Sequence, residues 1–319
     1  MSPSIEKIRL GISTCLLGER VRYDGGHKRD AFLADTLSRY VEWVPVCPEV
    51  ECGLPVPREA MHLAGDADSP HLLTIQTKID HTDRMLAWAA RRVRELEREG
   101  LCGFVFKSKS PSSGMERVKL YDAHGNSRKV AVGLFARAFM EHFPLLPVEE
   151  DGRLHDPVLR ENFIERIFCL KRYRDMVAAG GGRRRLVDFQ ADHKLLLLSH
   201  SAELMRRMGH LVGRAKEFKP SDLFAQYERL MLQALKLTAT VSKHVNALQH
   251  MMGHLRECLS ADEKRELLDV LGQYKSGLVP LVVPITLLQH HARKHQVEYL
   301  LRQVYLHPHP LELKLRNHA

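Results

Sequence analysis

The two halves of this 319-residue chain follow different hydrophobic patterns, and that difference limits the folds available to it. In the first half, short apolar runs near positions 7, 43, 103 and 145 alternate with a helical pattern over 83–100. Such alternation is typical of an α/β domain with a largely parallel sheet. The second half has long stretches of helical spacing and no convincing strand pattern. We therefore predict an N-terminal Rossmann-like α/β domain followed by an all-α domain.

The length supports two domains, since one domain usually takes about 100–200 residues. We expect the α/β domain over 1–150, a connecting segment over 151–185, and the helical domain over 186–319. The connecting segment ends in Ala178-Ala179-Gly180-Gly181-Gly182-Arg183-Arg184-Arg185, which is typical of a flexible, basic linker. In the helical half we expect helices over 189–216, 223–258 and 261–274, the third begun by a capping box of Ser260 and Glu263.

The composition indicates the cellular compartment in which the protein is expected. No apolar stretch approaches the roughly 18 residues of a membrane span, and the first ten residues lack the apolar core of a signal peptide. Six scattered cysteines do not make a disulfide scaffold. We expect a cytoplasmic protein with reduced thiols and no membrane association, and no obligate protein partner is evident from the sequence. Each cysteine is then core filler, a metal ligand or a nucleophile.

The positive charge lies entirely in the second half. Residues 1–150 carry 21 basic and 21 acidic side chains, whereas the whole chain carries 48 and 39, so residues 151–319 hold 27 and 18. The second half also contains 13 of the 19 histidines. A basic half joined to a neutral half indicates either a polyanion-binding domain beside a second activity or a solvated basic surface without a partner.

Reactive or polar clusters follow three of the predicted strands. The first cluster contains Cys15, the second Cys47 and Glu49, and the third is the serine-rich turn from Lys107 to Gly114. In an open α/β sheet, ligands bind beyond the carboxyl ends of the strands, so these three clusters are expected to converge on one site. From the residues alone, the favoured interpretation of Cys15 and Cys47 is that they are small buried hydrophobic side chains at strand ends.

Several multi-residue motifs closely resemble the thiouracil desulfidase (TudS) family. In the first half these are STCLLGERVRYDGGHK, VCPEVECGLPVPRE and FKSKSPSSGMERVKLYD. In the second half, FQADHKLLLLSHS, HVNALQHMMGHL, YKSGLVPLVVPITLLQHH and YLHPHPLELKLR are similar to the helical domain fused to TudS in RudS-type tRNA 4-thiouridine desulfidases. The resemblance covers nearly the whole chain, in the same domain order.

The resemblance implies a desulfidase that uses a [4Fe-4S] cluster held by three cysteines. Two of those ligands correspond to Cys15 and Cys47, while the third position is Ser113. A hydroxyl is a hard donor, whereas iron–sulfur clusters are held by soft thiolates. Either position 113 was substituted deliberately or the chain has diverged from the family there, and the intact surrounding turn favours a deliberate substitution. Glu49 resembles the family's catalytic acid/base, and Ser110 its second polar catalytic residue.

The helical half supplies candidate RNA-backbone contacts. These are Arg183, Arg184, Arg185, His193, Lys194 and Lys243. Histidines at 250, 254, 290, 291 and 295 have the appearance of metal ligands, yet no carboxylate or cysteine stands at a matching sequence spacing. RNA contact is therefore the better interpretation of this half.

The leading hypothesis is an iron–sulfur enzyme that converts 4-thiouridine in tRNA to uridine with release of sulfide. One alternative is a desulfidase for free thiouracil or 4-thio-UMP. Another is a catalytically silent RNA-binding protein, because Ser113 stands at a ligand position. The charge difference between the halves favours tRNA over a free nucleotide.

Overall fold

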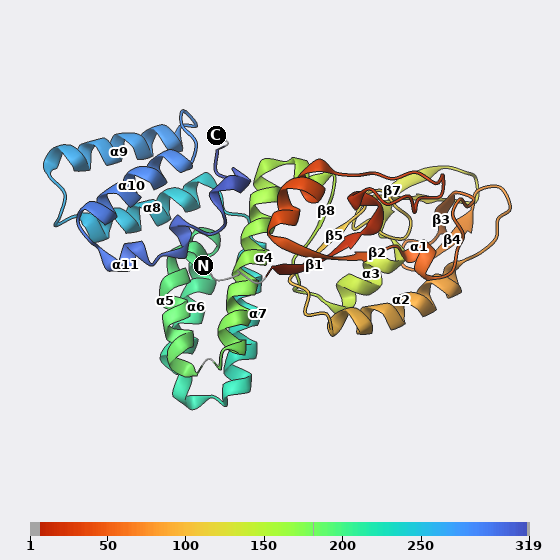
Figure 1. Cartoon of the computed structure of the whole chain (residues 1–319), viewed down its shortest axis with the longest axis horizontal. Coiled ribbons are helices and arrows are strands. Elements are labelled where there is room, and N and C mark those ends of the chain that lie inside the picture. The colour runs from red at the N-terminus through yellow and green to blue at the C-terminus, as the bar shows by residue number, and fades with distance from the viewer. Residues whose placement is uncertain (1–6, 181, 318–319) are drawn as a thin grey trace. The chain divides into compact units, whose positions relative to one another are not determined.

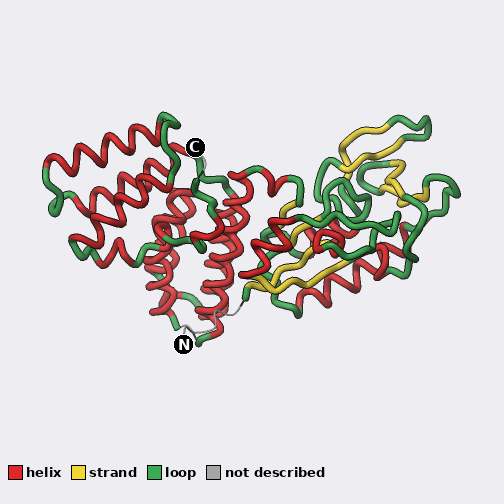
Figure 2. Tube along the Cα trace, turned by 45° about the horizontal axis from the view of Figure 1, so that its top comes forward, coloured by secondary structure: helices red, strands yellow, loops and turns green. Residues whose placement is uncertain are grey.

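The structure, a computed structural model, describes residues 7–180 and 182–317. The chain divides into two compact units, Met1–Asp156 and Pro157–Ala319. All of the described strands belong to the first unit, and the described part of the second contains helices only (Figure 2). The predicted fold class, an α/β domain followed by an all-helical region, is therefore confirmed.

A four-stranded parallel sheet forms the centre of the first unit, in the order β2-β1-β5-β8 (Figure 1). Its strands are β1 (Ile8–Ser13), β2 (Val41–Val46), β5 (Phe104–Phe106) and β8 (Val148–Glu150), which correspond to the four predicted apolar runs. Strand β1 pairs in parallel with both β2 and β5, and β5 pairs in parallel with β8. Because all four strands run the same way, their carboxyl ends meet at one edge.

A second sheet, not predicted from the sequence, has the order β4-β3-β6-β7. Its strands are β3 (Met61–Gly65), β4 (Pro70–Thr74), β6 (Val118–Tyr121) and β7 (Ser127–Ala131). Only β3 and β6 pair in parallel, and the two edge pairs are antiparallel. Strand β7 is exposed over four of its five residues, so its sequence SRKVA has none of the apolar alternation that indicates a strand.

Two longer helices contribute to the core of the first unit. Helix α2 (Thr82–Glu97) buries Met85, Trp88 and Leu96, and it packs against α3 (Leu134–His142). The rings of Phe104 and Phe139 lie 4.8 Å apart, which joins the sheet to α3. The remaining helix, α1 (Pro48–Glu51), is a single turn that follows β2. Short 3-10 or π segments occupy Thr14–Leu17, Phe32–Thr36, Leu37–Arg39 and Arg153–His155.

The second unit consists of α-helices and short 3-10 turns. The α-helices are α4 (Pro157–Ala178), α5 (Arg183–His200), α6 (Ala202–Gly213), α7 (Pro220–Lys236), α8 (Val241–Leu255), α9 (Ala261–Lys275), α10 (Val282–Lys294) and α11 (Glu298–Leu301). The 3-10 turns are Ala215–Glu217, Val304–Leu306 and Leu311–Leu313. The capping box of Ser260 and Glu263 is present at the start of α9, as predicted. No helix in the described ranges 7–180 and 182–317 has the length and apolarity needed to cross a membrane.

The structure differs from the sequence prediction at three helix boundaries. Helix α4 occupies most of the segment expected to connect the domains, and Arg183, Arg184 and Arg185 form the first turn of α5 rather than part of a flexible linker. The helix expected over 189–216 breaks at Ser201, whose hydroxyl accepts the N–H of Leu204 and caps α6. The helix expected over 223–258 breaks between α7 and α8. At the breaks at Ser201 and between α7 and α8, apolar residues continue on both sides of the break, so periodicity alone does not reveal it.

Candidate functional site

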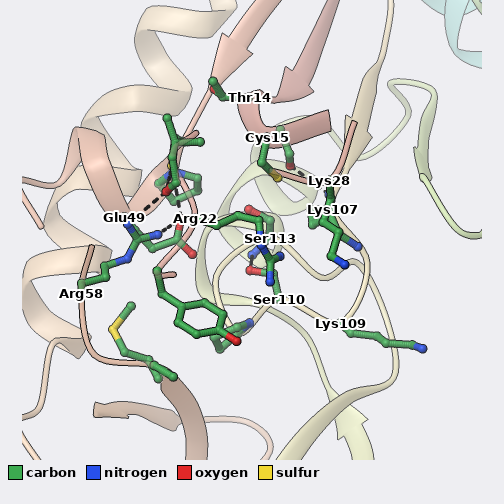
Figure 3. A pocket seen from close by; sticks show the side chains of 18 of the residues that line it. Thr14, Cys15, Arg22, Lys28, Glu49, Arg58, Lys107, Lys109, Ser110 and Ser113 are labelled. Carbon is green, nitrogen blue, oxygen red and sulfur yellow. Dashed lines mark hydrogen bonds and ion pairs between the residues drawn. The ribbon is translucent and has the colours of Figure 1, made fainter. Parts of the chain in front are cut away.

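The three clusters that follow β1, β2 and β5 line one cavity of about 440 Å³. Cys15, Cys47, Glu49, Ser110 and Ser113 all contribute to its wall (Figure 3). These residues are separated by up to 98 positions, and only the common edge of the parallel sheet brings them together. The predicted convergence of the three strand ends is therefore observed.

Cys15 lies in the 3-10 turn that follows β1. Its carbonyl accepts the N–H of Lys28 at 2.9 Å, and the turn ends at Gly18, whose φ of 100° is a left-handed conformation that favours glycine. The thiol is 9% exposed. Burial raises the pKa of Cys15 to about 11, although the nearby Lys107 lowers it. The group is therefore a protonated thiol in the metal-free chain.

Cys47 and Glu49 belong to the junction between β2 and α1. Cys47 is the N-cap residue of α1, and its backbone N–H donates to Oε1 of Glu51 at 3.0 Å. Burial, followed by the negative charge of Glu49, raises the pKa of the Cys47 thiol to about 12. The Cys47 sulfur lies 3.5 Å from Oε2 of Glu49, and Arg58 approaches the same carboxylate oxygen at 3.7 Å. The carboxylate is thus held at the cavity wall beside one of the two thiols.

The serine-rich turn connects its hydroxyls to Glu49. The Ser112 hydroxyl donates to Oε1 of Glu49, and the Ser110 and Ser112 oxygens lie 2.9 Å apart. Because the Ser112 proton is directed to Glu49, the Ser110 hydroxyl donates to Ser112, which gives a hydrogen-bonded chain from Ser110 to Glu49. Ser110 also accepts the backbone N–H of Ser113 at 3.1 Å. Sequence reasoning missed Ser112, which lay within the recognised motif but carried no distinguishing signal among its serine neighbours.

Two glycines allow this turn to be so compact. A Cβ on Gly133 would lie 2.5 Å from the carbonyl carbon and oxygen of Ser112, and one on Gly114 would lie 2.8 Å from the carbonyl oxygen of Ser110. The N–H of Gly133 also donates to the Gly114 carbonyl at 2.8 Å. Any side chain at either position would displace the turn that carries Ser110, Ser112 and Ser113.

Basic and aromatic side chains surround the rest of the cavity. Lys107 forms an ion pair with Asp151 at 2.9 Å. Burial alone would raise the pKa of the Asp151 carboxyl, but Lys107 and local hydrogen bonds have the larger combined effect and lower it. The Arg22 guanidinium lies 5.3 Å from the centre of the Tyr23 ring, which is 43% exposed. Lys28 and Lys109 complete the basic lining. A cavity of this kind suits an anionic ligand with a flat ring.

The donor set at the cavity consists of two thiols and a hydroxyl. Cys15 and Cys47 are the soft donors that an iron–sulfur cluster requires, and both face the same cavity. Ser113, 3% exposed, contributes a hard oxygen to that wall. Cys52 does not line the cavity, and its thiol donates instead to the Glu49 carbonyl at 3.2 Å. Two of three donor positions therefore fit a cluster, and position 113 fits it poorly.

The six candidate RNA contacts of the helical unit have different environments. His193 is buried, stacks on Phe189 with ring centres 3.7 Å apart, and accepts the Arg172 side chain at 3.2 Å. Burial, assisted by Arg172, lowers the pKa of His193 to about 3. The expectation that His193 contacts RNA is thus corrected, because its apolar stack on the i−4 residue places it in the core.

The five basic candidates differ in whether their side chains contact backbone carbonyls. Arg183 donates to the carbonyls of Ala215 and Phe218, and Arg185 donates to that of Ala179. Lys243 is half-buried and donates to the Thr238 carbonyl at 3.0 Å. Arg184 and Lys194 are exposed on α5. Arg183 and Arg185 are exposed as well, but their guanidinium groups are held by backbone carbonyls.

A carboxylate absent from the local sequence lies beside two of the histidines. The ligand atoms of Glu263, His291 and His295 lie within 4.8 Å of one another, because α9 packs against α10. Glu263 already accepts the Ser260 N–H in the capping box and the Lys294 ammonium, each at 2.7 Å. The sequence argument against a carboxylate partner was therefore incomplete, although this carboxylate has other partners.

Comparison with known proteins gives a different result for each half. Residues 10–151 match the 2-thiouracil desulfurase family, and residues 194–310 match a family described as a protein of unknown function (DUF1722). The uncharacterized protein YbgA of Escherichia coli (strain K12) is 27% identical over 153 residues, which are 48% of this chain and 90% of that protein. The solved structure of a [4Fe-4S]-dependent thiouracil desulfidase, TudS, has 27% identity and a TM-score of 0.40, covering 47% of this chain and 95% of that one.

Proposed function

Because this chain joins a 2-thiouracil desulfurase domain to a domain of the DUF1722 family, we propose that it removes sulfur from 4-thiouridine in tRNA. In the overall reaction, the oxygen of one water molecule bonds to the ring carbon, the carbon–sulfur bond breaks, and sulfur leaves as hydrogen sulfide. The observation that carries the proposal is the presence of two thiols and a carboxylate, Cys15, Cys47 and Glu49, around one cavity.

The cofactor in this proposal is a [4Fe-4S] cluster held by Cys15 and Cys47, with Ser113 at the third position. When bound, a cluster with one open iron supplies a Lewis acid that draws electron density from the thiocarbonyl. Both thiols must lose a proton to bind iron, so loading the site releases protons. The hydroxyl of Ser113 makes the third position the weak point of the site.

Glu49 is the proposed proton acceptor for the attacking water. Its carboxylate lines the cavity, accepts the Ser112 hydroxyl through Oε1, and keeps Oε2 toward Arg58 and Cys47. A carboxylate fixed on both oxygens is oriented before the substrate arrives, which is what general-base catalysis requires. Ser110 orients Ser112 and the N–H of Ser113, and thereby holds the turn opposite Glu49.

The helical unit is the proposed tRNA-holding module. Residues 151–319 carry nine more basic than acidic side chains, and Arg184 and Lys194 on α5 are exposed. Binding of this kind is electrostatic, so it weakens steeply as salt displaces the protein from phosphates.

Anaerobic reconstitution of the chain and of its Ser113→Cys variant tests the chemistry. We expect Ser113→Cys to hold about four irons per chain and to release sulfide from 4-thio-UMP faster, because a thiolate replaces a hard oxygen donor. Iron content, the visible absorption spectrum and sulfide are the measurements. If both proteins remain without iron and without activity, the desulfidase proposal is wrong and the silent RNA-binding alternative gains support.

A second experiment separates tRNA from a free nucleotide as substrate. We expect Arg184→Ala with Lys194→Ala to weaken tRNA binding and to lower the slope of log K against log salt by about one per lost phosphate contact. Exposed Lys275, at the end of α9, provides the control, Lys275→Ala. Equal affinity of all three proteins for tRNA, together with rapid turnover of 4-thio-UMP, would favour the free nucleotide.

A further inference from the structure

A second, larger cavity adjoins the candidate site in the α/β unit. Its volume is about 750 Å³, against about 440 Å³ for the first. Five residues line both cavities: Met61, Ile75, Ser108, Lys109 and Pro111. We propose that this second cavity binds the nucleotides that flank the thiolated base in a polynucleotide strand. This inference rests on the proposed function, whose chemistry belongs to the first cavity alone.

The floor of the second cavity includes one face of the second sheet. Parallel pairing places Leu63 opposite Leu120 and Ala64 opposite Tyr121. Because side chains alternate along a strand, Leu63 and Leu120 share the buried face, whereas Tyr121 and its i−2 neighbour Lys119 share the other. Lys119 pairs in turn with Lys129 of β7. A polar line of side chains therefore crosses the sheet along the cavity.

Lys119 and Lys129 form an unusual cross-strand pair. Both are exposed and directly opposite each other in the antiparallel register of β6 and β7. Like charges in this arrangement destabilise a sheet. Within the described part of the chain, no acidic side chain lies within ion-pair distance of either ammonium. A phosphate placed between the two lysines would remove the repulsion, whereas a neutral ligand would not.

The loop between the two cavities adds two more cations in a strained backbone. Lys109 has a φ of 61° and Arg117 a φ of 54°, both in the left-handed region that non-glycine residues rarely adopt. Such conformations are energetically unfavourable and cluster at ligand-binding sites. Both residues line the second cavity, and both are exposed. The loop thus places two cations at the second cavity, where the polynucleotide would bind, in an unfavourable backbone conformation.

The acidic residues of the same lining are already engaged. Glu116 pairs with Arg153 at 2.9 Å, and Glu150 accepts the N–H groups of Met115 and Glu116. The lining holds five basic side chains, Lys109, Arg117, Lys119, Lys129 and Arg153, against these two acidic ones, so the cavity has an excess of positive charge. This excess is local, since residues 1–150 as a whole carry equal numbers of basic and acidic side chains.

An aromatic pair completes the resemblance to a strand-binding surface. The rings of His62 and Tyr121 meet edge to face with centres 4.9 Å apart, and both side chains are half-buried. Bases of single-stranded nucleic acids stack on such rings without regard to sequence, while cations follow the backbone. The first cavity, of about 440 Å³, is of the size that holds one small ligand, so nucleotides on either side of the thiolated base need a further surface.

The test measures how much tighter the metal-free full chain binds a pentanucleotide than a mononucleotide. The probes are fluorescein-labelled pentauridylate with one central 4-thiouridine, and 4-thio-UMP. We expect Lys129→Ala to reduce the preference for the pentanucleotide roughly 3- to 10-fold and to lower its salt slope by about 0.7, the value for one single-strand contact. Arg128→Ala is the matched control, because Arg128 pairs with Leu120 and lies outside the cavity lining.

Crosslinking provides an independent readout. With 5-iodouridine next to the 4-thiouridine, irradiation should crosslink the strand to Tyr121 or His62, and peptide mapping would identify the site. Equal effects of Lys129→Ala and Arg128→Ala, with crosslinks outside both cavities, would overturn the strand-binding inference while leaving the binding of 4-thio-UMP intact. Failure of 4-thio-UMP itself to bind would count against the proposed function instead.

Discussion

Each unit contains a cluster of buried polar groups among its described residues, and these two clusters are organised differently. In the helical unit, the Arg316 guanidinium donates to Glu161 at 3.1 Å and to Glu165 at 2.7 Å, and His200 contacts Glu165 at 3.1 Å. All four residues are less than 10% exposed. In the α/β unit, two thiols, a carboxylate and several hydroxyls line an open cavity. Burial raises the pKa of both thiols by more than Lys107 lowers that of Cys15 or Arg58 that of Cys47.

The polar groups of the helical cluster stabilise the fold, whereas those of the α/β cavity are arranged to bind a ligand. In the helical cluster, opposite charges compensate one another, so removing one member leaves a buried charge without a partner. In the cavity, the hydrogen bonds orient Glu49 but leave Cys15 and Cys47 available to a metal. We therefore expect substitutions in the first cluster to change stability, and substitutions in the second to change chemistry.

The largest expected effect is on chemistry. Glu49→Gln should reduce sulfide release from 4-thio-UMP by about 10²–10⁴-fold, because glutamine keeps the size of the side chain but cannot accept the proton of water. The measurement is initial sulfide release by the reconstituted Ser113→Cys protein with and without the second change. Glu51→Gln, two residues along α1 and outside the cavity lining, is the control and should lose less than tenfold, because the glutamine oxygen can still accept the Cys47 N–H. A similar loss in both would remove Glu49 from the proposed role.

The next effect is on stability. Arg316→Met should destabilise the helical unit by about 3–5 kcal/mol, because it leaves the carboxylates of Glu161 and Glu165 buried without their guanidinium. Urea unfolding followed by circular dichroism measures this free energy. Arg256→Met is the matched control, since Arg256 is 75% exposed and its loss should change stability by less than about 0.5 kcal/mol. Equal stabilities would mean that the buried cluster does not hold the fold.

Acid should reveal a third difference between the units. The pKa of His193 in the folded chain is about 3, below the ordinary value of 6.5, because burial and then Arg172 disfavour its charged form. Between pH 6.5 and 3 the unfolded chain therefore binds a proton that the folded chain does not, and stability falls by about 1.4 kcal/mol per pH unit. His193→Gln should make this decline shallower by that amount. Unfolding free energies at pH 7, 6 and 5 provide the measurement, and unchanged slopes would contradict it.

The smallest effect sets the scale for surface contributions. Ser260→Ala removes the hydroxyl that accepts the Glu263 N–H in the capping box of α9, and it should cost about 1 kcal/mol. Ser201→Ala, which removes the corresponding bond at α6, should cost a similar amount. If either cap substitution lowered the free energy of unfolding as much as Arg316→Met does, the buried cluster would contribute no more to stability than an ordinary helix end.

Much of the α/β unit could be predicted from the sequence because its central strands are largely buried. Phe104–Phe106 is buried throughout and Ile8–Ser13 is buried except at Arg9, which is the pattern expected of strands inside a parallel sheet. Once the sheet is parallel, residues just after its strands share an edge, which is why Cys15, Cys47 and Ser113 could be expected at one site.

The parts that could not be predicted depend on contacts between distant segments. The second sheet is built from short strands with exposed residues. It therefore depends on the pairing of β3 with β6, which are far apart in the sequence, and local periodicity does not reveal it. The burial of His193 follows from its stack on Phe189, although its sequence neighbour Lys194 is exposed. Likewise, Glu263 reaches His291 only because two helices pack together.

The backbone contact between Gly133 and Ser112 has a consequence for mutational scanning. Gly133 touches neither thiol and lies 20 positions beyond Ser113, yet even alanine there would push against the Ser112 carbonyl and misalign the hydroxyls that reach Glu49. A screen for lost sulfide release would consequently rank position 133 with the reactive residues. Loss of sulfide release at both Glu49 and Gly133 would therefore not mean that both residues contact the substrate.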